Sequence, residues 1–414
     1  MPGSRDGRKN DVGVLVLGDY RQTLTVVRSL ARAGYRVFAG TTGQPFRYAR
    51  YSRHVSEHWR GPECRPGTCT DSSREFVLAM LGFLEQRPGI KWVFPVGEKD
   101  LRVLGPHVGR LESRVGLVMS DAKVIEACTV KTIANGKAEA CGIHVPKNET
   151  VHSREELIKA ANAIGYPCVV KPVSERHEIE GEKARILQSP LDLEKYFKKW
   201  PDNNAQLIVQ RFAEGRRHNC QFLAHEGRLL AYFENIVLRT TRSNGTGYGT
   251  DCLSMTPSPT LRGHCETLLM HLNYSGSGCV QFLVDDQSGI VSFLEINPRL
   301  DATCALAVHC GYDFPLLALE YARYRHGMRP TPPRNDSPYP SRRAVWLLGE
   351  IEGLGHELRR HHIGVREAWF AFQSTLRSAI LADVHLVWSW RDPLPALHAC
   401  AKLLSSIRFR TSGQ

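Results

Sequence analysis

The sequence has no apolar run long enough to cross a bilayer and no apolar core of a signal peptide near its start. A membrane-spanning helix needs about 20 consecutive apolar residues. Residues 1–10 are polar and charged, whereas a signal peptide requires a central apolar region. These absences argue against a spanning or exported protein, and we expect a cytoplasmic one.

Paired cysteine patterns are also missing. The 12 cysteines are scattered and do not form the compact framework of small secreted domains, so we expect reduced thiols. His54, His58, Cys64 and Cys69 are all zinc-ligand types, but their spacing fits no usual zinc pattern. The sequence leaves a zinc site there open without favouring it.

The chain lacks a recognisable nucleic-acid-binding motif, although its formal net charge is +12. Such a charge suits anionic ligands, which include nucleotides, acidic substrates and an anionic membrane surface. Much of the excess lies in arginines of the last third, which a solvated surface would also explain. We expect small anionic partners and no nucleic acid.

The start of the chain predicts a strand–helix–strand unit. Residues 12–17 are typical of a buried parallel strand, residues 23–33 of a helix and residues 35–39 of a second strand. This is the beginning of a Rossmann-like domain. The turn after the first strand, Gly18-Asp19-Tyr20, lacks the Gly-x-Gly-x-x-Gly pattern, so we predict no dinucleotide site. Its position at the carboxyl end of a strand fits either a substrate contact or a plain turn.

The segment 278–303 predicts a hairpin with chemistry at one end. Residues 279–284 and 290–296 read as strands joined by a turn. Alternation puts Glu295, Asn297 and Arg299 on one face, and Gln281 can face them from the partner strand. Carboxylate and amide oxygens are ligands that Mg²⁺ accepts, and an arginine fork suits a phosphoryl group.

This hairpin resembles the metal-binding end of the ATP-grasp fold, in the branch of carbamoyl-phosphate synthase and biotin carboxylase. That branch carries an acid or Gln on one strand and Glu-x-Asn-Pro-Arg on the next. The resemblance covers residues 11–328. It implies a mixed α/β and α+β fold, with a Rossmann-like domain at 1–118, a two-lobed ATP-grasp domain at 119–328, and a linker with a mostly helical C-terminal extension at 329–414. It also implies Mg²⁺, or Mn²⁺ in its place, at Gln281, Glu295 and Asn297.

The resemblance further implies two phosphate-binding lysines. Lys131 lies about 11 residues before a Gly-Ile-x-Val-Pro turn, with Lys123 and Lys137 as competitors if the register is wrong. Lys171 ends a Gly-Tyr-Pro-(apolar)₃-Lys-Pro run. Both would neutralise phosphates of ATP and leave the γ-phosphoryl group exposed for transfer. The loop that follows, residues 173–184, holds one glycine where the family has a glycine-rich lid.

The family's adenine hinge corresponds to a segment that begins at Gln210. Backbone groups of Arg211, Phe212 and Ala213 would contact the base, with Glu214 as the nearby acid. The family usually places further acids here, including one for the ribose, where this chain has Arg211, Arg217 and His218. Such an arginine-rich pocket could instead hold a second anionic ligand.

Two regions resemble substrate contacts of the family. Arg239 and Arg242 lie in a glycine-containing loop, residues 239–250, and could clamp a carboxylate, although a plain surface loop explains them equally well. Glu98 follows a predicted strand at residues 91–95, where the family has an acid. A helix-start carboxylate favoured by the helix dipole is the alternative for Glu98.

Together these features predict an ATP-dependent ligase that joins a carboxylate to an amine (or thiol) through an acyl phosphate. Lys171 and Arg299 would be catalytic, with Arg299 stabilising developing charge. The chain shows no convincing Cys–His or Ser–His pair, which fits chemistry based on positioning. Bicarbonate phosphorylation is less favoured, since there is no second ATP-grasp copy, amidotransferase half or biotin-attachment segment. The alternative is an ATP-binding regulatory or scaffold module without turnover, which the glycine-poor lid favours; a third is a kinase that leaves a stable phosphate ester.

The last 75 residues match no family element. Residues 345–360 and 392–409 predict helices, the second with Asp392 as its cap. The second helix is basic and amphipathic, so it could rest on a membrane, but we favour packing against the body of the protein. We also expect a homodimer.

Overall fold

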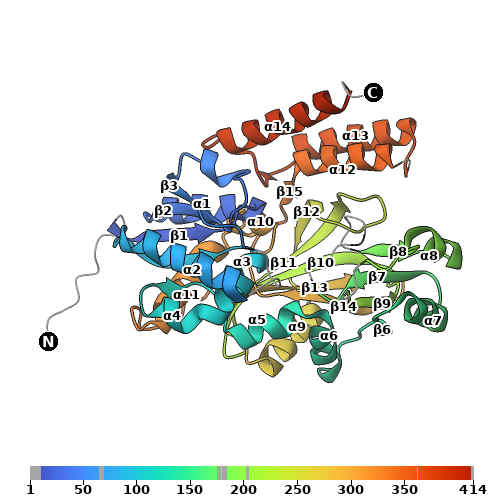
Figure 1. Ribbon diagram of the computed structural model, residues 1–414, viewed down its shortest axis with the longest axis horizontal. Helices are drawn as coiled ribbons and strands as arrows, with labels where there is room; N and C mark the ends of the chain where they lie inside the picture. Colours follow the sequence, from blue (N-terminus) through green and yellow to red (C-terminus); the bar gives the residue numbers. More distant parts are fainter. Residues whose placement is uncertain are drawn as a thin grey trace.

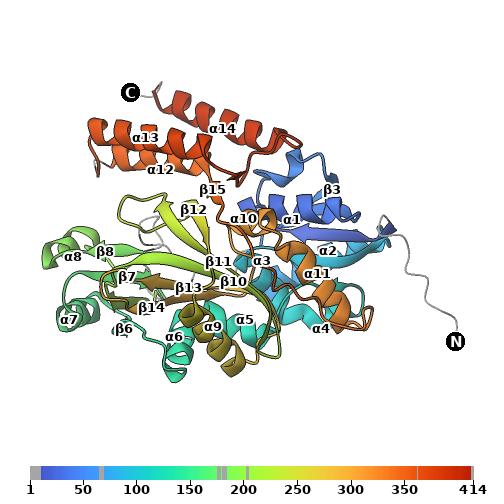
Figure 2. The same cartoon turned by 180° about the vertical axis from the view of Figure 1, so that it is seen from behind.

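A computed structural model describes residues 11–64, 70–174, 179, 184–201, 205–360 and 362–411. The described residues form three β-sheets with helices around them, and Figures 1 and 2 show the molecule from opposite sides. Among these residues no helix has the length and apolar character that a membrane crossing requires.

The N-terminal sheet is parallel, in the order β3-β2-β1-β4-β5. Its strands are β1 (Gly13–Leu17), β2 (Arg36–Thr41), β3 (Val55–Arg60), β4 (Ile90–Pro95) and β5 (Gly116–Leu117). The helical elements of this part are α1 (Arg21–Arg32), η2 (Ala49–Tyr51), α2 (Thr70–Glu85), α3 (Glu98–Leu104), η3 (Gly105–His107) and α4 (Val108–Glu112). Residues of β1 contribute to two hydrophobic clusters, one on each face of the sheet, which explains the wholly apolar run that predicted this strand.

A small four-stranded sheet follows, in the order β6-β9-β7-β8. Its strands are β6 (Asn148–Val151), β7 (Cys168–Pro172), β8 (Arg185–Leu187) and β9 (Leu207–Arg211). Helices α7 (Arg154–Ile164) and α8 (Pro190–Tyr196) contribute apolar residues to the core of this lobe.

The third sheet has seven strands, in the order β14-β13-β10-β11-β12-β15-β16. They are β10 (Arg216–His225), β11 (Arg228–Thr240), β12 (Gly249–Met255), β13 (Gly276–Val284), β14 (Val291–Asn297), β15 (Arg343–Val345) and β16 (Val384–His385). The predicted hairpin is confirmed as β13 and β14, with Gln281 opposite Glu295.

Helices cover both faces of this third sheet. One hydrophobic cluster joins the sheet to α5 (Ala122–Thr129), α6 (Lys131–Ala140) and α9 (Pro259–His271). Another joins it to α1, to α10 (Cys304–His309) and to α11 (Phe314–Arg325). The second cluster therefore makes one continuous core between the N-terminal sheet and the seven-stranded sheet.

The C-terminal part joins the seven-stranded sheet directly. Strand β15 pairs with β12 and includes Val345, so the predicted helix 345–360 is wrong at its start and begins as α12 (Leu347–Arg359). Helix α13 (Val365–Ile380) was not predicted, and α14 (Leu394–Thr411) matches the predicted second helix. The three helices form a layer at one end of the molecule (Figure 1), where α12 contacts β12 and α14 contacts η2.

Asp392 does not cap the last helix as predicted. Its buried carboxylate accepts hydrogen bonds from Arg28 Nε at 2.9 Å, Ser52 Oγ at 2.8 Å and Arg53 N at 3.0 Å. Burial alone would raise the pKa of Asp392, but these hydrogen bonds hold it below its ordinary value. Asp392 thus fastens the C-terminal segment to the N-terminal domain, an outcome that depends on tertiary partners.

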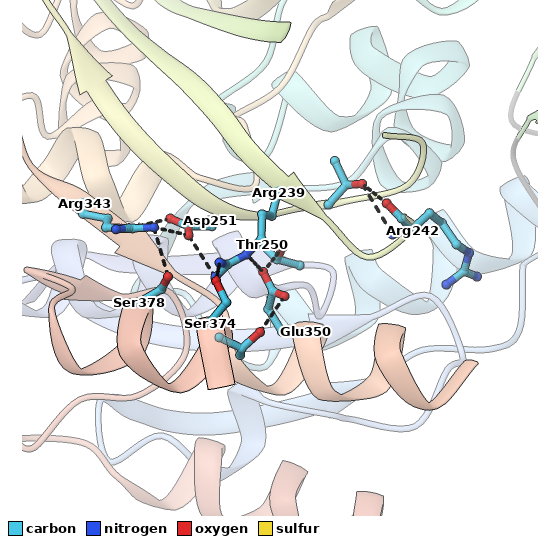
Figure 3. A network of polar contacts seen from close by, with 10 residues as sticks. Arg239, Arg242, Thr250, Asp251, Arg343, Glu350, Ser374 and Ser378 are labelled. Carbon is cyan, nitrogen blue, oxygen red and sulfur yellow. Dashed lines mark hydrogen bonds and ion pairs between the residues drawn. The ribbon is translucent and has the colours of Figure 1, made fainter. Parts of the chain in front are cut away.

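A buried network of ion pairs fastens the C-terminal helices to β11 and β12 (Figure 3). Arg343 donates to both carboxylate oxygens of Asp251, at 2.8 and 2.6 Å, and Arg239 lies 2.9 Å from the same group. Arg239 also donates to Glu350 of α12 at 3.0 Å. Asp251 is fully buried, so its charge depends on these two guanidinium groups.

We expect Asp251→Ala to lower the free energy of unfolding by about 3 kcal/mol, because it leaves two arginines without their buried partner. Urea denaturation followed by circular dichroism measures this. The matched control is Asp286→Ala, which removes an exposed carboxylate paired with Arg216 and should cost less than about 1 kcal/mol. Equal losses in the two variants would contradict the role assigned to the network.

Candidate nucleotide and metal site

The hairpin β13–β14 brings the three predicted metal ligands together. Asn297 Nδ2 donates to Glu295 Oε1 at 2.8 Å, and Gln281 lies directly across the ladder from Glu295. Gln281 and Asn297 are buried. The group offers one carboxylate and two side-chain amides, so its oxygen atoms fit a hard cation.

These three side chains supply only part of the oxygen ligands that Mg²⁺ needs. Among the described residues, no group of three or more His, Cys, Asp or Glu side chains is placed to hold a metal ion. A site with one carboxylate would need further oxygen ligands from a bound molecule, and phosphates are the usual source for Mg²⁺. The zinc question stays open, because Cys69 lies outside the described residues.

Lys171 faces this group from the small sheet. It is buried at the end of β7, and desolvation lowers the pKa of its ammonium to about 8, together with the charge of Lys131; the charge of Glu295 acts in the opposite direction. The first amide of α6, Lys131 N, donates to Val173 O just past β7 at 3.1 Å. This bond explains why the two lysines, 40 positions apart, lie near each other.

The predicted adenine hinge is at the end of β9. Gln210 is buried and donates to Pro146 O at 3.3 Å. The amides of Arg211 and Phe212 donate to Lys147 O and Pro167 O, at 2.8 and 3.2 Å. A base here would be contacted by carbonyl groups or by Ala213 rather than by these two amides. Glu214 is exposed in the turn before β10.

The predicted lid falls on residues 173–184, and most of these lie outside the described residues. Arg299 lies two residues after β14, is half-buried and donates from Nη1 to Leu300 O at 3.2 Å. Its predicted catalytic role stays a prediction, as do the contacts assigned to the metal ligands and lysines.

The predicted substrate residues already have protein partners. Arg239 is bound by Asp251 and Glu350 (Figure 3), and Arg242 Nε lies 4.0 Å from a carboxylate oxygen of Glu357. A clamp on a substrate would require these ion pairs to open. Glu98 is buried at the start of α3 and pairs with Arg102 at 3.3 Å.

The turn after β1 has a structural function at Asp19. The Asp19 carboxylate accepts hydrogen bonds from the amides of Arg47, Tyr48 and Ala49. Burial raises the pKa of this carboxyl group against those bonds. The sequence left two roles open for this turn, a substrate contact and a plain connecting turn. The hydrogen bonds of Asp19 fit the plain connecting turn.

Two arginines lie near the carboxyl edge of β1: Arg21, which the sequence did not single out, and Arg217, which it left open as a contact for a second anionic ligand. Arg21 is buried, donates to Gly249 O at 3.0 Å and lies 3.9 Å above the centroid of the Trp346 ring. Arg217 donates to Gly247 O at 3.1 Å, and its buried Nε has no hydrogen-bond partner. Neither guanidinium forms an ion pair with another described residue.

Gly249 contacts both cations: its carbonyl accepts from Arg21, and a Cβ built on Gly249 would lie 3.3 Å from Arg217 Nη2. Burial and the charge of Asp301 raise the pKa of the nearby Cys252 to about 12, and the charges of Arg217 and Arg21 act against that rise. The seven-stranded sheet carries three buried amide side chains nearby, two on β10 and one on β11. Three of their polar atoms lack a hydrogen-bond partner in the described structure, namely Asn219 Oδ1, Gln221 Oε1 and Asn235 Nδ2. One buried and one partly buried cation, beside amides that each keep one unpaired atom, favour a polar, anionic ligand.

Parts of this chain are similar in sequence to known proteins. Residues 130–325 match the family model described as the carbamoyl-phosphate synthase L chain, ATP binding domain. The large chain of carbamoyl phosphate synthase from Ralstonia nicotianae is 27% identical over 173 residues, which are 39% of this chain and 16% of that protein. The C-terminal section of the Methanopyrus kandleri large chain is 25% identical over 239 residues, 54% of this chain and 40% of that protein. The matches thus span less than half the length of these relatives.

Solved structures share the fold at low sequence identity. N5-carboxyaminoimidazole synthetase from Staphylococcus aureus gives a TM-score of 0.60 at 12% identity, covering 84% of this chain and 86% of its own. The biotin carboxylase domain of 2-oxoglutarate carboxylase from Hydrogenobacter thermophilus, a dimer in complex with MgADP, ADP and bicarbonate, gives 0.58 at 17%, covering 80% and 73%. L-amino acid ligase from Bacillus licheniformis gives 0.58 at 14%, covering 76% and 74%.

These likenesses confirm the predicted fold class, a parallel N-terminal sheet followed by two antiparallel lobes. The family match begins one residue before Lys131 and contains the small sheet, Lys171 and the hairpin that carries Glu295. At residues 130–325 the chain therefore carries an ATP-grasp domain of the carbamoyl-phosphate synthase L chain type.

Proposed function

We propose that the protein is an ATP-dependent ligase that joins a carboxylate to an amine (or thiol) through an acyl phosphate. The observation that carries the proposal is the convergence of Lys131, Lys171 and Glu295 from α6, β7 and β14. Two ammonium groups beside one carboxylate and two amides suit a polyphosphate with its cation. The match to an ATP-binding domain supports ATP as that polyphosphate.

The binding roles follow from the chemistry of each group. Lys131 and Lys171 would hold phosphates of ATP, and Gln281, Glu295 and Asn297 would hold Mg²⁺. Mg²⁺, when bound, neutralises charge on the β- and γ-phosphates. The related fold that binds MgADP supports this assignment. Burial of Lys171 means that its charge acts on the phosphates with little screening by water.

The reaction requires positioning more than a protein nucleophile. A carboxylate oxygen attacks the γ-phosphorus, the bond from phosphorus to the β,γ-bridging oxygen breaks, and ADP leaves. The amine nitrogen then attacks the acyl carbon, phosphate leaves, and the amine loses a proton. Arg299, placed just after the metal ligands, would stabilise charge on the transferring group. An amino acid ligase among the structural neighbours supports this reaction class.

Arg21 and Arg217 would hold a carboxylate of the acid substrate. Both cations lack an ion-pair partner among the described residues, and Arg21 is enclosed by Trp346 and the backbone of Gly249. A bound carboxylate would add to the charge of Asp301, which already acts on Arg21, and would accept bidentate hydrogen bonds. Arg239 and Arg242 keep their predicted role as substrate contacts. That role requires their ion pairs with acidic residues to open.

The homodimer expected from the sequence stays part of the proposal. One structural neighbour is described as a dimer. Light scattering on the purified protein in solution measures the mass of the assembly directly and so tests the homodimer.

The first prediction of the proposed function concerns Glu295. Calorimetry with ATP and Mg²⁺ should give binding to the wild type and at least about a tenfold weaker, Mg²⁺-independent signal for Glu295→Ala, because the only carboxylate of the metal group is lost. The matched control Asp286→Ala removes an exposed carboxylate on the turn of the same hairpin and should bind as wild type.

The same protein is then mixed with ATP and a panel of acids and amines. ADP release that needs both an acid and an amine supports the ligase. Binding without ADP release from any mixture supports an ATP-binding module without turnover. Release with an alcohol alone, which leaves a stable phosphate ester, supports a kinase.

The second prediction concerns protons. Because the pKa of Lys171 is about 8 in the free protein, its amine is mostly neutral at pH 9 and mostly charged at pH 6.5. ATP binding should recharge it, so calorimetry in buffers of different ionisation enthalpy should show uptake of about one proton at pH 9 and almost none at pH 6.5. Affinity should fall as the pH rises through 8. Lys171→Arg, which stays charged, should remove the uptake; uptake that persists in this variant would contradict the assignment.

The third prediction concerns the acid substrate. Arg21→Met should raise KM for the acid about thirtyfold and leave KM for ATP unchanged, since a buried charge partner of the carboxylate is lost. The control Arg228→Met removes an exposed arginine at the start of β11. A parallel rise of both KM values would mean that Arg21 acts on the fold instead.

A further inference from the structure

Exposed apolar side chains concentrate at the C-terminal end of the described chain. Among the residues that the structure describes, seventeen large hydrophobic residues are exposed, and ten of them lie between residues 365 and 404. They are Val365, Trp369, Phe370, Leu376, Ile380, Leu381, Trp390, Leu394, Leu397 and Leu404. The other seven are scattered over the rest of the described residues, so this group is a surface feature of its own and we call it the C-terminal apolar surface.

Helix α13 supplies half of these ten residues because its two faces have the reverse of the usual pattern. Its inner face is small and polar, with Ala368, Thr375, Ser378 and Ala379 buried. Its outer face is apolar, and Val365 and Ile380 are more than 80% exposed. A surface helix normally turns its apolar stripe toward the core. Here the stripe faces away from the protein, which predicts an external apolar partner.

The polar neighbours of this surface are cationic. Arg366 and Arg377 on α13, Arg391 beside Trp390, and Lys402 on α14 are exposed, and none forms an ion pair with another described residue. Two of the three nearby acids form ion pairs, and Glu367 alone keeps its charge beside these four cations. Glu367 accepts from the amide of Gly364, Asp383 pairs with Arg342, and Asp392 pairs with Arg28. The outward charge of this region is therefore positive.

We propose that the C-terminal apolar surface docks on an anionic lipid bilayer. Exposed Trp369, Phe370 and Trp390 are the side chains that insert best at the boundary between headgroups and acyl chains. The flanking arginines and lysine attract anionic headgroups. An apolar face with basic residues beside it is the arrangement of helices that lie in the plane of a membrane.

Charge distinguishes the bilayer from a second copy of this chain. A two-fold interface places each surface against its own copy, so four unpaired cations would face four identical cations. An anionic bilayer instead offers the opposite charge along the whole surface.

The docking surface is held rigidly to the candidate active site. On the inner side of α13, Ser374 accepts from Arg239 at 3.0 Å and Ser378 from Arg343 at 3.0 Å (Figure 3). Thr375 donates to Glu350 at 3.1 Å. These bonds connect α13 to β11, β15 and α12, and Arg239 and Arg343 both pair with Asp251 of β12. A docked protein would therefore present β11 and β12 at a fixed position relative to the membrane.

Flotation with lipid vesicles tests the proposal on the full chain. Vesicles of phosphatidylcholine alone are compared with vesicles that contain about 30% phosphatidylserine, at low salt and at about 0.5 M NaCl. We expect partitioning to be about tenfold stronger on the anionic vesicles and to weaken in high salt. Trp369→Ser/Trp390→Ser and, separately, Arg366→Glu/Arg377→Glu should each lower partitioning about tenfold.

The matched control is Leu191→Ser/Met270→Ser, which removes two exposed apolar side chains elsewhere and should partition as wild type. Circular dichroism confirms that each variant is folded. Absence of partitioning on anionic vesicles, or equal partitioning of all variants, overturns the proposal. It is also overturned if light scattering shows a dimer that the tryptophan variant converts to a monomer, since the surface would then belong to a second copy.

Discussion

Two ammonium groups held near one another, one of them buried, are the constraint on which the rest of the candidate site depends. Lys171 is buried at the end of β7, and the nearby charge of Lys131 adds to the burial in lowering its pKa. Like charges so placed are costly unless an anion joins them. Three features hold the two lysines beside the metal group. Lys131 N donates to Val173 O, and α6 packs on the large sheet. The strand register sets Gln281 opposite Glu295.

A second set of buried charges determines how the C-terminal part is attached. Asp251 and Glu350 take their partners from β11, β15 and α13, so three segments far apart in sequence share one network. Asp392 makes a comparable attachment to α1 and to the region of η2. Because these carboxylates are buried, the C-terminal helices are part of the fold that positions the loop between β11 and β12, rather than an appendage.

Local patterns in the sequence predicted the elements whose signal is local. The apolar run of β1, the alternation in β14 and the Lys-Pro end of β7 all lie where they were expected. The helix α13 was missed because its apolar residues face outward, so its pattern does not report a buried face. Arg21 was missed because a lone arginine at a helix start carries no local signal; its significance comes from Trp346 and Gly249, more than 200 positions away. Asp392 was misassigned for the same reason, since its partners lie on the N-terminal domain.

The measurement that tests the central claim most directly is positional isotope exchange in ATP labelled with ¹⁸O at the β,γ-bridging position. Reversible transfer of the γ-phosphoryl group to a carboxylate frees the β-phosphate of ADP to rotate in the site, so the label moves to a non-bridging position. The account predicts exchange that requires Mg²⁺ and a carboxylic acid, occurs without any amine, and is lost in Glu295→Ala. Net ADP release from an acid and an amine with no exchange from any acid alone, or exchange that persists without Glu295, would contradict an acyl phosphate formed at this site.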